Sequence, residues 1–406
     1  MTRTQGFTFD FHPGTIVVGA GCLDRLGDEL DRRGRERALL VGGRTVGTTP
    51  AVVDPIREGL GDRLVAEFPE TTPAKTLGTA LDGLRLARDL DVDVVVAVGG
   101  GSTLDTTKTL AALSSHEDSE AVAERAVETG ELPVAADGAP LPVVAVPTTL
   151  AGADLSDIAG VTLTLDRDVS ADASHETGGV GDPRLMPEAL FYDADLYRTT
   201  PTSVLAASAM NGFDKGIEML YLPYATPVTD GTAARGLRLL QSGLRTIRAE
   251  PMDGDRLADV LGGIVNVQYG LAGADGYRAS IIHAFGHGFS HDSDVHQGTI
   301  HGVLAPDVLR YVFDSVNGRR DLLAEALGVR VEGRSDTAVA AGVVDAVAAV
   351  RDDLGLPNRL RDVEGVEQKQ FPEIAAAIAE DDLLDGAPES LDPTVEGIVG
   401  ILERAW

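Results

Sequence analysis

The sequence predicts an α/β domain built on a parallel sheet, followed by an all-helical domain. Short apolar runs alternate with helical patterns through the first 200 of the 406 residues, as in a parallel sheet covered by helices on both faces. The run 92–98 is almost purely Val and Ala, and 141–146 is similar, which is typical of strands buried on both faces. Beyond residue 201 helical periodicity continues almost without strand signals, so we expect domains at 1–200 and 201–406.

The elements are expected in this order along the chain. Strands are predicted at 15–18, 37–41, 63–68, 92–98, 141–146, 161–165 and 189–192, and helices at 23–33, 50–60 and 76–90. Residues 114–140 are acidic and rich in Ala, Gly and Pro, and they predict an insertion or a surface segment. Thr202 or Ser203 can N-cap a helix that runs to about Tyr221. Further helices are predicted at 229–248, 255–272, 278–290, 302–314, 319–327, 336–353, 371–379 and 393–405.

The charge and cysteine content narrow the possible functions. The chain has 34 basic and 64 acidic residues and a net charge of −30, without the basic stripe of a nucleic-acid-binding protein. The acids are spread along the chain, which predicts an acidic surface adapted to high salt. Cys22 is the only cysteine, which excludes an internal disulfide and a cysteine-based zinc site. The sequence shows no signal-peptide core and no run of 18 apolar residues, so we expect a cytoplasmic protein without a membrane partner.

A glycine-rich turn follows the most apolar predicted strand. The segment VVVAVGGGSTLDTTK places Gly99–Gly101 between this strand and a helix that begins near Ser102. Glycines let the backbone approach a ligand closely, and a helix N-terminus attracts anions such as a pyrophosphate. Asp105 has capping-box spacing from Ser102, and Lys108 can reach an anionic ligand or pair with Asp105. A tight β–α turn without a ligand is the alternative.

A second loop follows the next buried strand. The segment PTTLAG begins at Pro147 and offers the hydroxyls of Thr148 and Thr149 beside a glycine. Ligands of open α/β sheets bind beyond the carboxyl ends of the strands, where both loops are expected. A simple turn is again the alternative.

Five of the eight histidines are concentrated in one short segment. They are His283, His287, His291, His296 and His301. His283 and His287 are four residues apart and therefore share a helix face, which suits metal binding or proton transfer. Residues 291–296 are polar and predict a loop, and His301 stands near the start of the next helix. Hydrogen-bonded or surface histidines without a shared function are the alternative.

Together these motifs resemble the iron-containing (group III) alcohol dehydrogenase superfamily, which includes the maleylacetate reductases, over most of the chain. GGGSTLDTTK is similar to the family's GGGSxxDxxK, PTTLAGADLS to its PTTxxxGSE, and the FYD at 191–193 to its YDP. SAMNGFDKGIE at 208–218 resembles the helix that opens the family's helical domain. HAFGH at 283–287 and HG at 301–302 resemble its HxxxH…HG.

The resemblance implies a Rossmann-like dinucleotide-binding domain, a helical catalytic domain and an NAD(P)-dependent oxidoreductase. Hydride would pass between the nicotinamide and a small alcohol, carbonyl or oxoacid substrate in a cleft between the domains, and the chain would form a homo-oligomer. Arg44 follows the second strand where many NAD-preferring relatives have Asp, and it can accept a 2′-phosphate, so NAD and NADP both stay open. The expected cofactor-binding residues are Gly42, Arg44, Gly99, Gly100, Gly101, Ser102, Asp105, Lys108, Thr148 and Thr149.

Two of the family's four metal-ligand positions differ in this chain. Metal-dependent members place Asp and His four residues apart on the first helix of the helical domain, and here these positions hold Asn211 and Lys215. Only His283 and His301 remain as ligands for a divalent iron or zinc ion, which would act as a Lewis acid.

Two explanations compete for this difference. In the first, the ammonium of Lys215 replaces the metal, polarising a carbonyl or holding a substrate carboxylate, and His287 or His283 relays the proton. In the second, the register differs, and Asp214 and Glu218 bind a metal beside the histidines. A surface salt bridge of Lys215 with either carboxylate is the alternative without a function. The expected catalytic residues are Lys215, His283, His287 and His301.

Two other functional classes stay open. Dehydroquinate-synthase-like enzymes share this architecture and use NAD transiently, although their dense Lys and Arg site for a substrate phosphate is not evident in the sequence. A non-catalytic relative that keeps the fold and binds a nucleotide is the second possibility.

The acidic surface leads to a first testable prediction. If salt screens the repulsion among the excess of acidic groups, the Tm of the protein should fall when molar salt is removed. Differential scanning calorimetry in low and in molar KCl measures this shift. An equal Tm in both conditions would contradict adaptation to high salt.

Overall fold

The computed structural model describes residues 9, 14–167, 169, 177–273, 279–290 and 295–406. Its contacts form two compact units, with a boundary between Pro201 and Thr202. The parallel sheet belongs to the unit that ends at Pro201, and the unit that begins at Thr202 is helical in its described residues.

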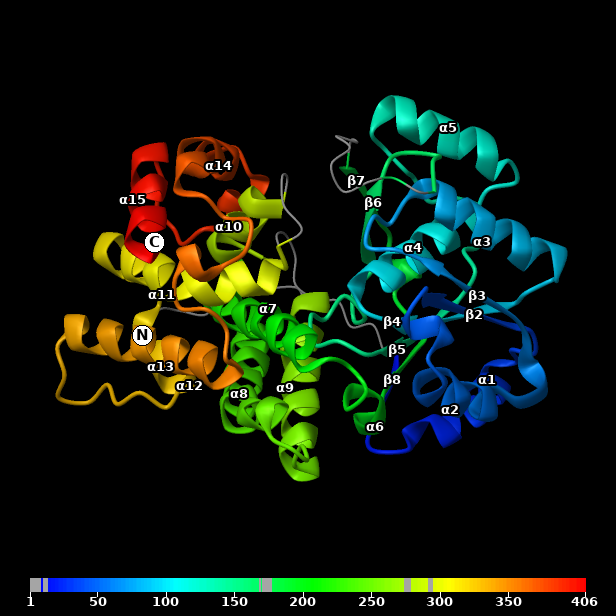
Figure 1. The fold of residues 1–406 in the computed structure, drawn as a ribbon, viewed down its shortest axis with the longest axis horizontal. Coiled ribbons are helices and arrows are strands. Elements are labelled where there is room, and N and C mark those ends of the chain that lie inside the picture. The colour runs from blue at the N-terminus through cyan, green and yellow to red at the C-terminus, as the bar shows by residue number, and fades with distance from the viewer. Residues whose placement is uncertain (1–8, 10–13, 168, 170–176, 274–278, 291–294) are drawn as a thin grey trace. The chain divides into compact units, whose positions relative to one another are not determined.

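The first unit is built on a six-stranded parallel sheet with the strand order β1-β8-β5-β4-β2-β3 (Figure 1). Its strands are β1 (Thr15–Val18), β2 (Ala38–Gly43), β3 (Leu64–Thr71), β4 (Val94–Gly99), β5 (Val143–Pro147) and β8 (Ala189–Tyr192). Its helices are α1 (Leu26–Arg33), α2 (Pro50–Leu60), α3 (Leu77–Asp89), α4 (Gly101–Ser114), α5 (Ser119–Thr129) and α6 (Ala194–Tyr197). The predicted α/β fold of the first half is confirmed.

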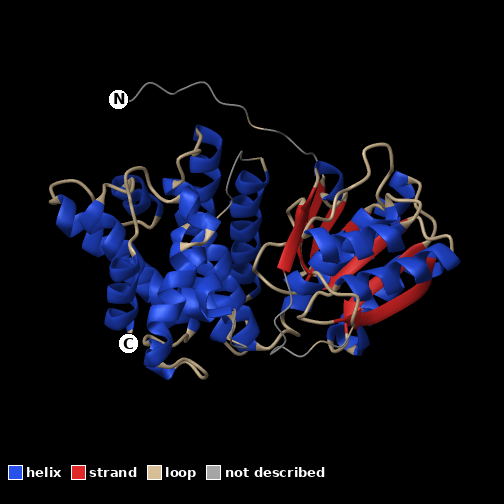
Figure 2. Cartoon of the chain, turned by 90° about the horizontal axis from the view of Figure 1, so that it is seen from above, coloured by secondary structure: helices blue, strands red, loops and turns tan. Residues whose placement is uncertain are grey.

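Successive strand residues pack on opposite faces of this sheet. Leu39 and Val41 of β2 join the core cluster that contains residues of α3, α4 and α5. Leu40 joins the cluster that contains residues of α1 and α2. Helices therefore cover both faces of the sheet (Figure 2). The six residues of β4 are all buried, which explains why its sequence is uniformly apolar instead of alternating.

One prediction for the first half needs correction. Of the strand predicted at 161–165, only the first two residues are in a strand, at the end of β6 (Ile158–Thr162), which pairs antiparallel with β7 (Thr177–Gly181) in a separate two-stranded sheet. The sequence does not predict β7, because three of its five residues are glycine. The expected insertion at 114–140 contains the helix α5, whose N-terminus is capped by the side chain of Asp118.

The second unit surrounds one buried helix, α7 (Thr202–Tyr221), whose predicted range is confirmed. This helix is buried on all faces over most of its length and packs against α8, α9, α10 and α11. The other helices are α8 (Pro227–Gly243), α9 (Gly254–Ala272), α10 (Ile281–Ser290), α11 (Gln297–Ser315), α12 (Arg320–Ala326), α13 (Asp336–Leu354), α14 (Phe371–Ala379) and α15 (Val395–Ala405). In the part of the chain that the structure describes, no helix has the length and hydropathy of a membrane span.

Candidate functional site

The glycine-rich turn lies at the carboxyl end of β4. Gly99 has a φ of +148°, which residues with a Cβ rarely adopt. A Cβ on Gly99 would lie 2.8 Å from Oγ1 of Thr103, and one on Gly100 would lie 3.0 Å from Cγ2 of Thr149. The glycines therefore bring bare backbone against two threonines, directly before α4 begins at Gly101.

The loop after β5 lies beside this turn. Pro147 is the register partner of Gly99, and the N–H of Thr148 donates to the carbonyl oxygen of Gly99 over 3.0 Å. The carbonyl of the buried Thr148 accepts a hydrogen bond from the hydroxyl of Thr200 over 2.9 Å. The loops after β4 and β5 thus meet at the carboxyl ends of neighbouring parallel strands, where open α/β sheets bind ligands.

The start of α4 differs from the predicted capping box. Its N-cap is Gly100, and no side chain caps the helix, so Ser102 and Asp105 do not play that role. Asp105 instead accepts a hydrogen bond from Nζ of Lys75 over 2.9 Å. A helix N-terminus without a side-chain cap is the kind of site that binds an anion.

Lys108 is fully buried two turns into α4. Its Nζ donates to the carbonyl oxygens of Ala153, over 2.7 Å, and Ile158, over 3.2 Å. These bonds hold the segment that leads into β6 against α4. These contacts give Lys108 a structural role, and its predicted contact with a ligand or with Asp105 stays a prediction.

The loop after β2 carries the third group of predicted cofactor-binding residues. A Cβ on Gly42 would lie 2.8 Å from the Cα atom of Gly47, so this position requires glycine. The N–H of the half-exposed Arg44 donates to the carbonyl of Thr71, and its guanidinium lies 3.6 Å from the carboxylate of Glu70. The hydroxyls of Thr71 and Thr103 are 2.8 Å apart and join the end of β3 to the first turn of α4. We call the loops after β2, β4 and β5 the nucleotide surface.

In the second unit, Glu218 of α7 joins the start of α10. Its carboxylate accepts hydrogen bonds from the backbone N–H groups of Ser280 (2.9 Å), Ile282 (2.6 Å) and His283 (3.3 Å). It also lies 2.6 Å from Nδ1 of His283. Burial raises the pKa of Glu218 to about 7, although these hydrogen bonds lower it. Burial lowers the pKa of His283 well below its usual range, and the charge of Lys215 lowers it further. A neutral His283 therefore donates from Nδ1 and keeps a lone pair on Nε2.

His301 of α11 packs against this histidine. The two rings are 4.4 Å apart between centroids, and Nδ1 of His301 lies 3.5 Å from Oδ2 of Asp214. Gly286 makes room for the ring, because a Cβ there would lie 2.2 Å from its Nε2. Burial raises the pKa of Asp214 and lowers that of His301, each well beyond its usual range. Nε2 of both rings is buried and has no hydrogen-bond partner among the described residues. We call Asp214, Glu218, His283 and His301 the histidine centre.

The other predicted histidines have different surroundings. The side chain of His287 is 43% exposed, and its Nδ1 lies 2.8 Å from Oδ2 of Asp381. His296 caps α11 by accepting from the N–H of Gly298 over 3.2 Å. His291 lies outside the described residues. The structure thus brings His283 and His301 together and gives His287 a carboxylate partner nearer the surface.

The two substituted ligand positions lie on α7. Asn211 is buried, and Lys215 is half-buried and close enough to lower the pKa of both His283 and His301 by its charge. Among the described residues, no group of three or more His, Cys, Asp and Glu side chains is arranged to hold a metal ion. Because Asn211 and a lysine stand at two of the four ligand positions that the resemblance implies, the donor set does not match that four-ligand metal centre.

The alternative alignment, in which Asp214 and Glu218 bind a metal beside the histidines, stays a prediction. Asp214 and Glu218 are both fully buried on α7. The carboxylate of Glu218 is already engaged by the start of α10 and by His283. Its role as the organiser of α10 is not visible in the sequence, because the groups that it binds lie more than 60 residues further along the chain.

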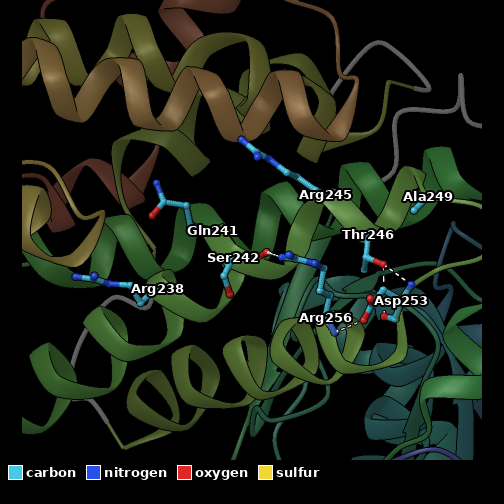
Figure 3. Close-up of a pocket in the computed structure, with 8 residues that line it drawn as sticks. All are labelled: Arg238, Gln241, Ser242, Arg245, Thr246, Ala249, Asp253 and Arg256. Carbon is cyan, nitrogen blue, oxygen red and sulfur yellow. Dashed lines mark hydrogen bonds between the residues drawn. The ribbon is translucent and has the colours of Figure 1, made fainter.

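A separate open pocket of about 630 Å³ lies between α8 and α9 (Figure 3). It contains three arginines, which point in different directions and have partners of their own. Arg238 donates to the carbonyl of Glu325, Arg245 pairs with Asp353, and Arg256 donates to the carbonyl of Ser242. The guanidinium groups do not converge on one point, so this pocket is a poor anion site.

Two family descriptions match almost the whole chain. Residues 13–194 match "Iron-containing alcohol dehydrogenase", and residues 205–406 match "Fe-containing alcohol dehydrogenase family, C-terminal". The lactaldehyde reductase of Escherichia coli strain K12 is 29% identical, with 97% of this chain and 98% of the relative covered. Maleylacetate reductase 1 of Rhodococcus opacus is 26% identical, with 100% of this chain and 97% of the relative covered.

Solved structures show the same fold. The sulfoacetaldehyde reductase of Bifidobacterium kashiwanohense in complex with NAD+ matches with a TM-score of 0.82 and 18% identity, covering 98% of this chain and 99% of the other. This agreement extends over both the α/β half and the helical half.

The close approach at Gly286 gives a second prediction. Gly286→Ala should displace the ring of His301 and destabilise the fold by about 1–3 kcal/mol, the usual cost of overpacking. Urea denaturation measures the change in midpoint. Gly262→Ala is the matched control, because its Cβ would meet only Leu239 at 3.8 Å within a helix. A wild-type midpoint for Gly286→Ala would contradict the tight packing of this ring.

Proposed function

We propose that this chain, which belongs to the iron-containing alcohol dehydrogenase family, is an NAD(P)-dependent oxidoreductase acting on an alcohol or carbonyl substrate. The family's members are alcohol and aldehyde oxidoreductases. The observation that carries the proposal is the nucleotide surface, where a buried strand, a glycine with φ of +148° and an N-terminus without a side-chain cap follow one another. When bound, the nicotinamide cofactor supplies or accepts the hydride.

The nucleotide surface suits a dinucleotide for two reasons. The backbone N–H groups at the start of α4 bind a pyrophosphate, since the glycines leave them uncovered. Thr148 and Thr149 belong to the adjoining loop, and a Cβ on Gly100 would lie 3.0 Å from the side chain of Thr149.

Arg44, in the loop after β2, lies next to Glu70 and has the charge to bind a 2′-phosphate, which favours NADP.

The histidine centre suits a catalytic site without a metal. We assign Lys215 as the group that polarises the substrate carbonyl, because its ammonium stabilises the negative charge that develops on the carbonyl oxygen during hydride transfer. Its charge lowers the pKa of His283 and His301, in addition to the larger effect of burial. The same ammonium can hold the carboxylate of an oxoacid, a substrate of the kind that the maleylacetate reductases reduce.

His287 suits the proton relay better than His283 does. Nδ1 of His283 is held by the buried Glu218, whereas His287 is partly exposed and paired with Asp381. A half-exposed imidazole held by a carboxylate can exchange a proton with solvent and pass it to an alkoxide. Reduction of a carbonyl therefore ends with protonation through His287.

The activity itself can be tested by absorbance at 340 nm. NADPH with a panel of aldehydes and oxoacids should show steady oxidation that depends on the carbonyl substrate. A single equivalent oxidised without turnover would instead favour a synthase that uses the cofactor transiently. Cofactor binding without any effect of substrate would favour a non-catalytic relative.

The role of Lys215 gives the third prediction. Lys215→Met should lower kcat by about 100-fold or more, as does the removal of an oxyanion donor in other enzymes, with little change in NADPH binding. Lys369→Met, at an exposed lysine, is the matched control.

Metal analysis should find less than stoichiometric iron, zinc or manganese in the purified wild type. Asn211→Asp with Lys215→His, which restores the family's two ligand types, should take up a divalent ion. Stoichiometric metal in the wild type would contradict this role.

Cofactor preference gives the fourth prediction. Arg44→Ala should raise KM for NADPH by about tenfold, the value of one charge-assisted hydrogen bond, and leave KM for NADH almost unchanged. Initial rates with both cofactors measure the two constants. Arg57→Ala, which removes another exposed arginine of this unit, should change neither. An equal effect on NADH and NADPH would argue against recognition of a 2′-phosphate.

A further inference from the structure

Lys75 adopts a backbone conformation that is rare for a residue with a side chain. Its φ is +49°, in the left-handed region that favours glycine. The loop is fixed there, because the N–H of Lys75 donates to the carbonyl of Thr72 and its own carbonyl accepts from the N–H of Thr162, each over 3.1 Å. The hydroxyl of Thr162 also donates to the carbonyl of Ala74 over 2.6 Å. Strain of this kind persists only where the surrounding structure enforces it, and it is concentrated at functional sites.

The side chain of Lys75 reaches the first turns of α4. Its Nζ donates to Oδ2 of Asp105 over 2.9 Å, and the two side chains are 31% and 15% exposed. Gly160 of β6 allows this path, since a Cβ there would lie 2.9 Å from Nζ. Asp105 is four residues beyond Gly101, so both lie on one helix face, about one 5.4 Å turn apart.

This position places a cation where the nucleotide surface needs one. The carboxylate of Asp105 lies within about one turn of the N–H groups proposed for the pyrophosphate, and it would repel bound phosphates. The ammonium of Lys75 offsets this charge. It also has three N–H donors, of which one binds Asp105. Lys108, on the same face of α4, already donates to two backbone carbonyls.

We propose that Lys75 is a phosphate-binding residue of the nucleotide site, with its ammonium oriented by Asp105 toward the pyrophosphate bound at the start of α4. This role rests on the proposed function and extends it, because Lys108, the other charged donor described on this face of α4, already binds two backbone carbonyls. The strained backbone of Lys75 and the side chain missing at Gly160 both serve to place this one ammonium.

The test uses isothermal titration calorimetry on the full chain, with ADP-ribose as the pyrophosphate probe and adenosine as the probe without phosphate. Lys75→Met should weaken ADP-ribose binding by about tenfold or more, as expected for loss of one charge-assisted hydrogen bond, and leave adenosine binding unchanged. Lys75→Arg should retain most of the affinity. Lys369→Met, at a lysine that is 77% exposed, is the matched control and should bind as the wild type does.

Lys75→Gly separates binding from folding. Glycine accepts a positive φ without strain, so this variant should keep the wild-type Tm and still lose affinity for ADP-ribose. Equal ADP-ribose affinity of the wild type and Lys75→Met would overturn the role of Lys75 alone. A parallel loss of adenosine affinity would overturn it too, because it would indicate a structural role. A wild type that binds neither ADP-ribose nor NADPH would overturn the proposed function and this role together.

Discussion

The hydrogen bonds to the carboxylate of Glu218 are the interaction on which the histidine centre depends. They join α7 to the start of α10 and fix the ring of His283 at the same time. A buried carboxylate is costly to desolvate, and here the backbone N–H groups and the positive end of the α10 dipole offset that cost. Because one carboxylate makes all of these contacts, the position of α10 and the orientation of the His283 ring depend on each other.

His301 is held by shape more than by hydrogen bonds. The ring fits against α10 because Gly286 has no side chain, and its only ionisable neighbour on α7 within salt-bridge distance among the described residues is Asp214, at 3.5 Å. Buried polar nitrogens without partners are rare in folded proteins. Three such nitrogens lie on the two adjacent rings among the described residues, namely Nε2 of His283 and both nitrogens of His301, as expected of a site that a polar atom of a ligand completes.

Patterns with local causes could be predicted from the sequence. The strand, glycine turn and helix at 94–114 follow from apolar runs and backbone chemistry, and the buried helix of 202–221 follows from its periodicity. The partners of charged side chains could not be predicted, because they lie far along the chain. Asp214 and Glu218 look equivalent on one helix face, and only the start of α10 distinguishes them. Lys75 carries no motif, and its importance depends on the fold that brings it to Asp105.

A lysine at a ligand position changes what the neighbouring histidines do. A divalent ion needs several donors that converge on it, and Asn211 and a charged Lys215 supply at most one neutral oxygen. An ammonium is itself a donor, and the lone pair on Nε2 of His283 is an acceptor. Burial is the main cause that lowers the pKa of both histidines, and the charge of Lys215 adds to it. A divalent ion beside this ammonium would be repelled, which is the physical reason for proposing that Lys215 replaces the metal at this site.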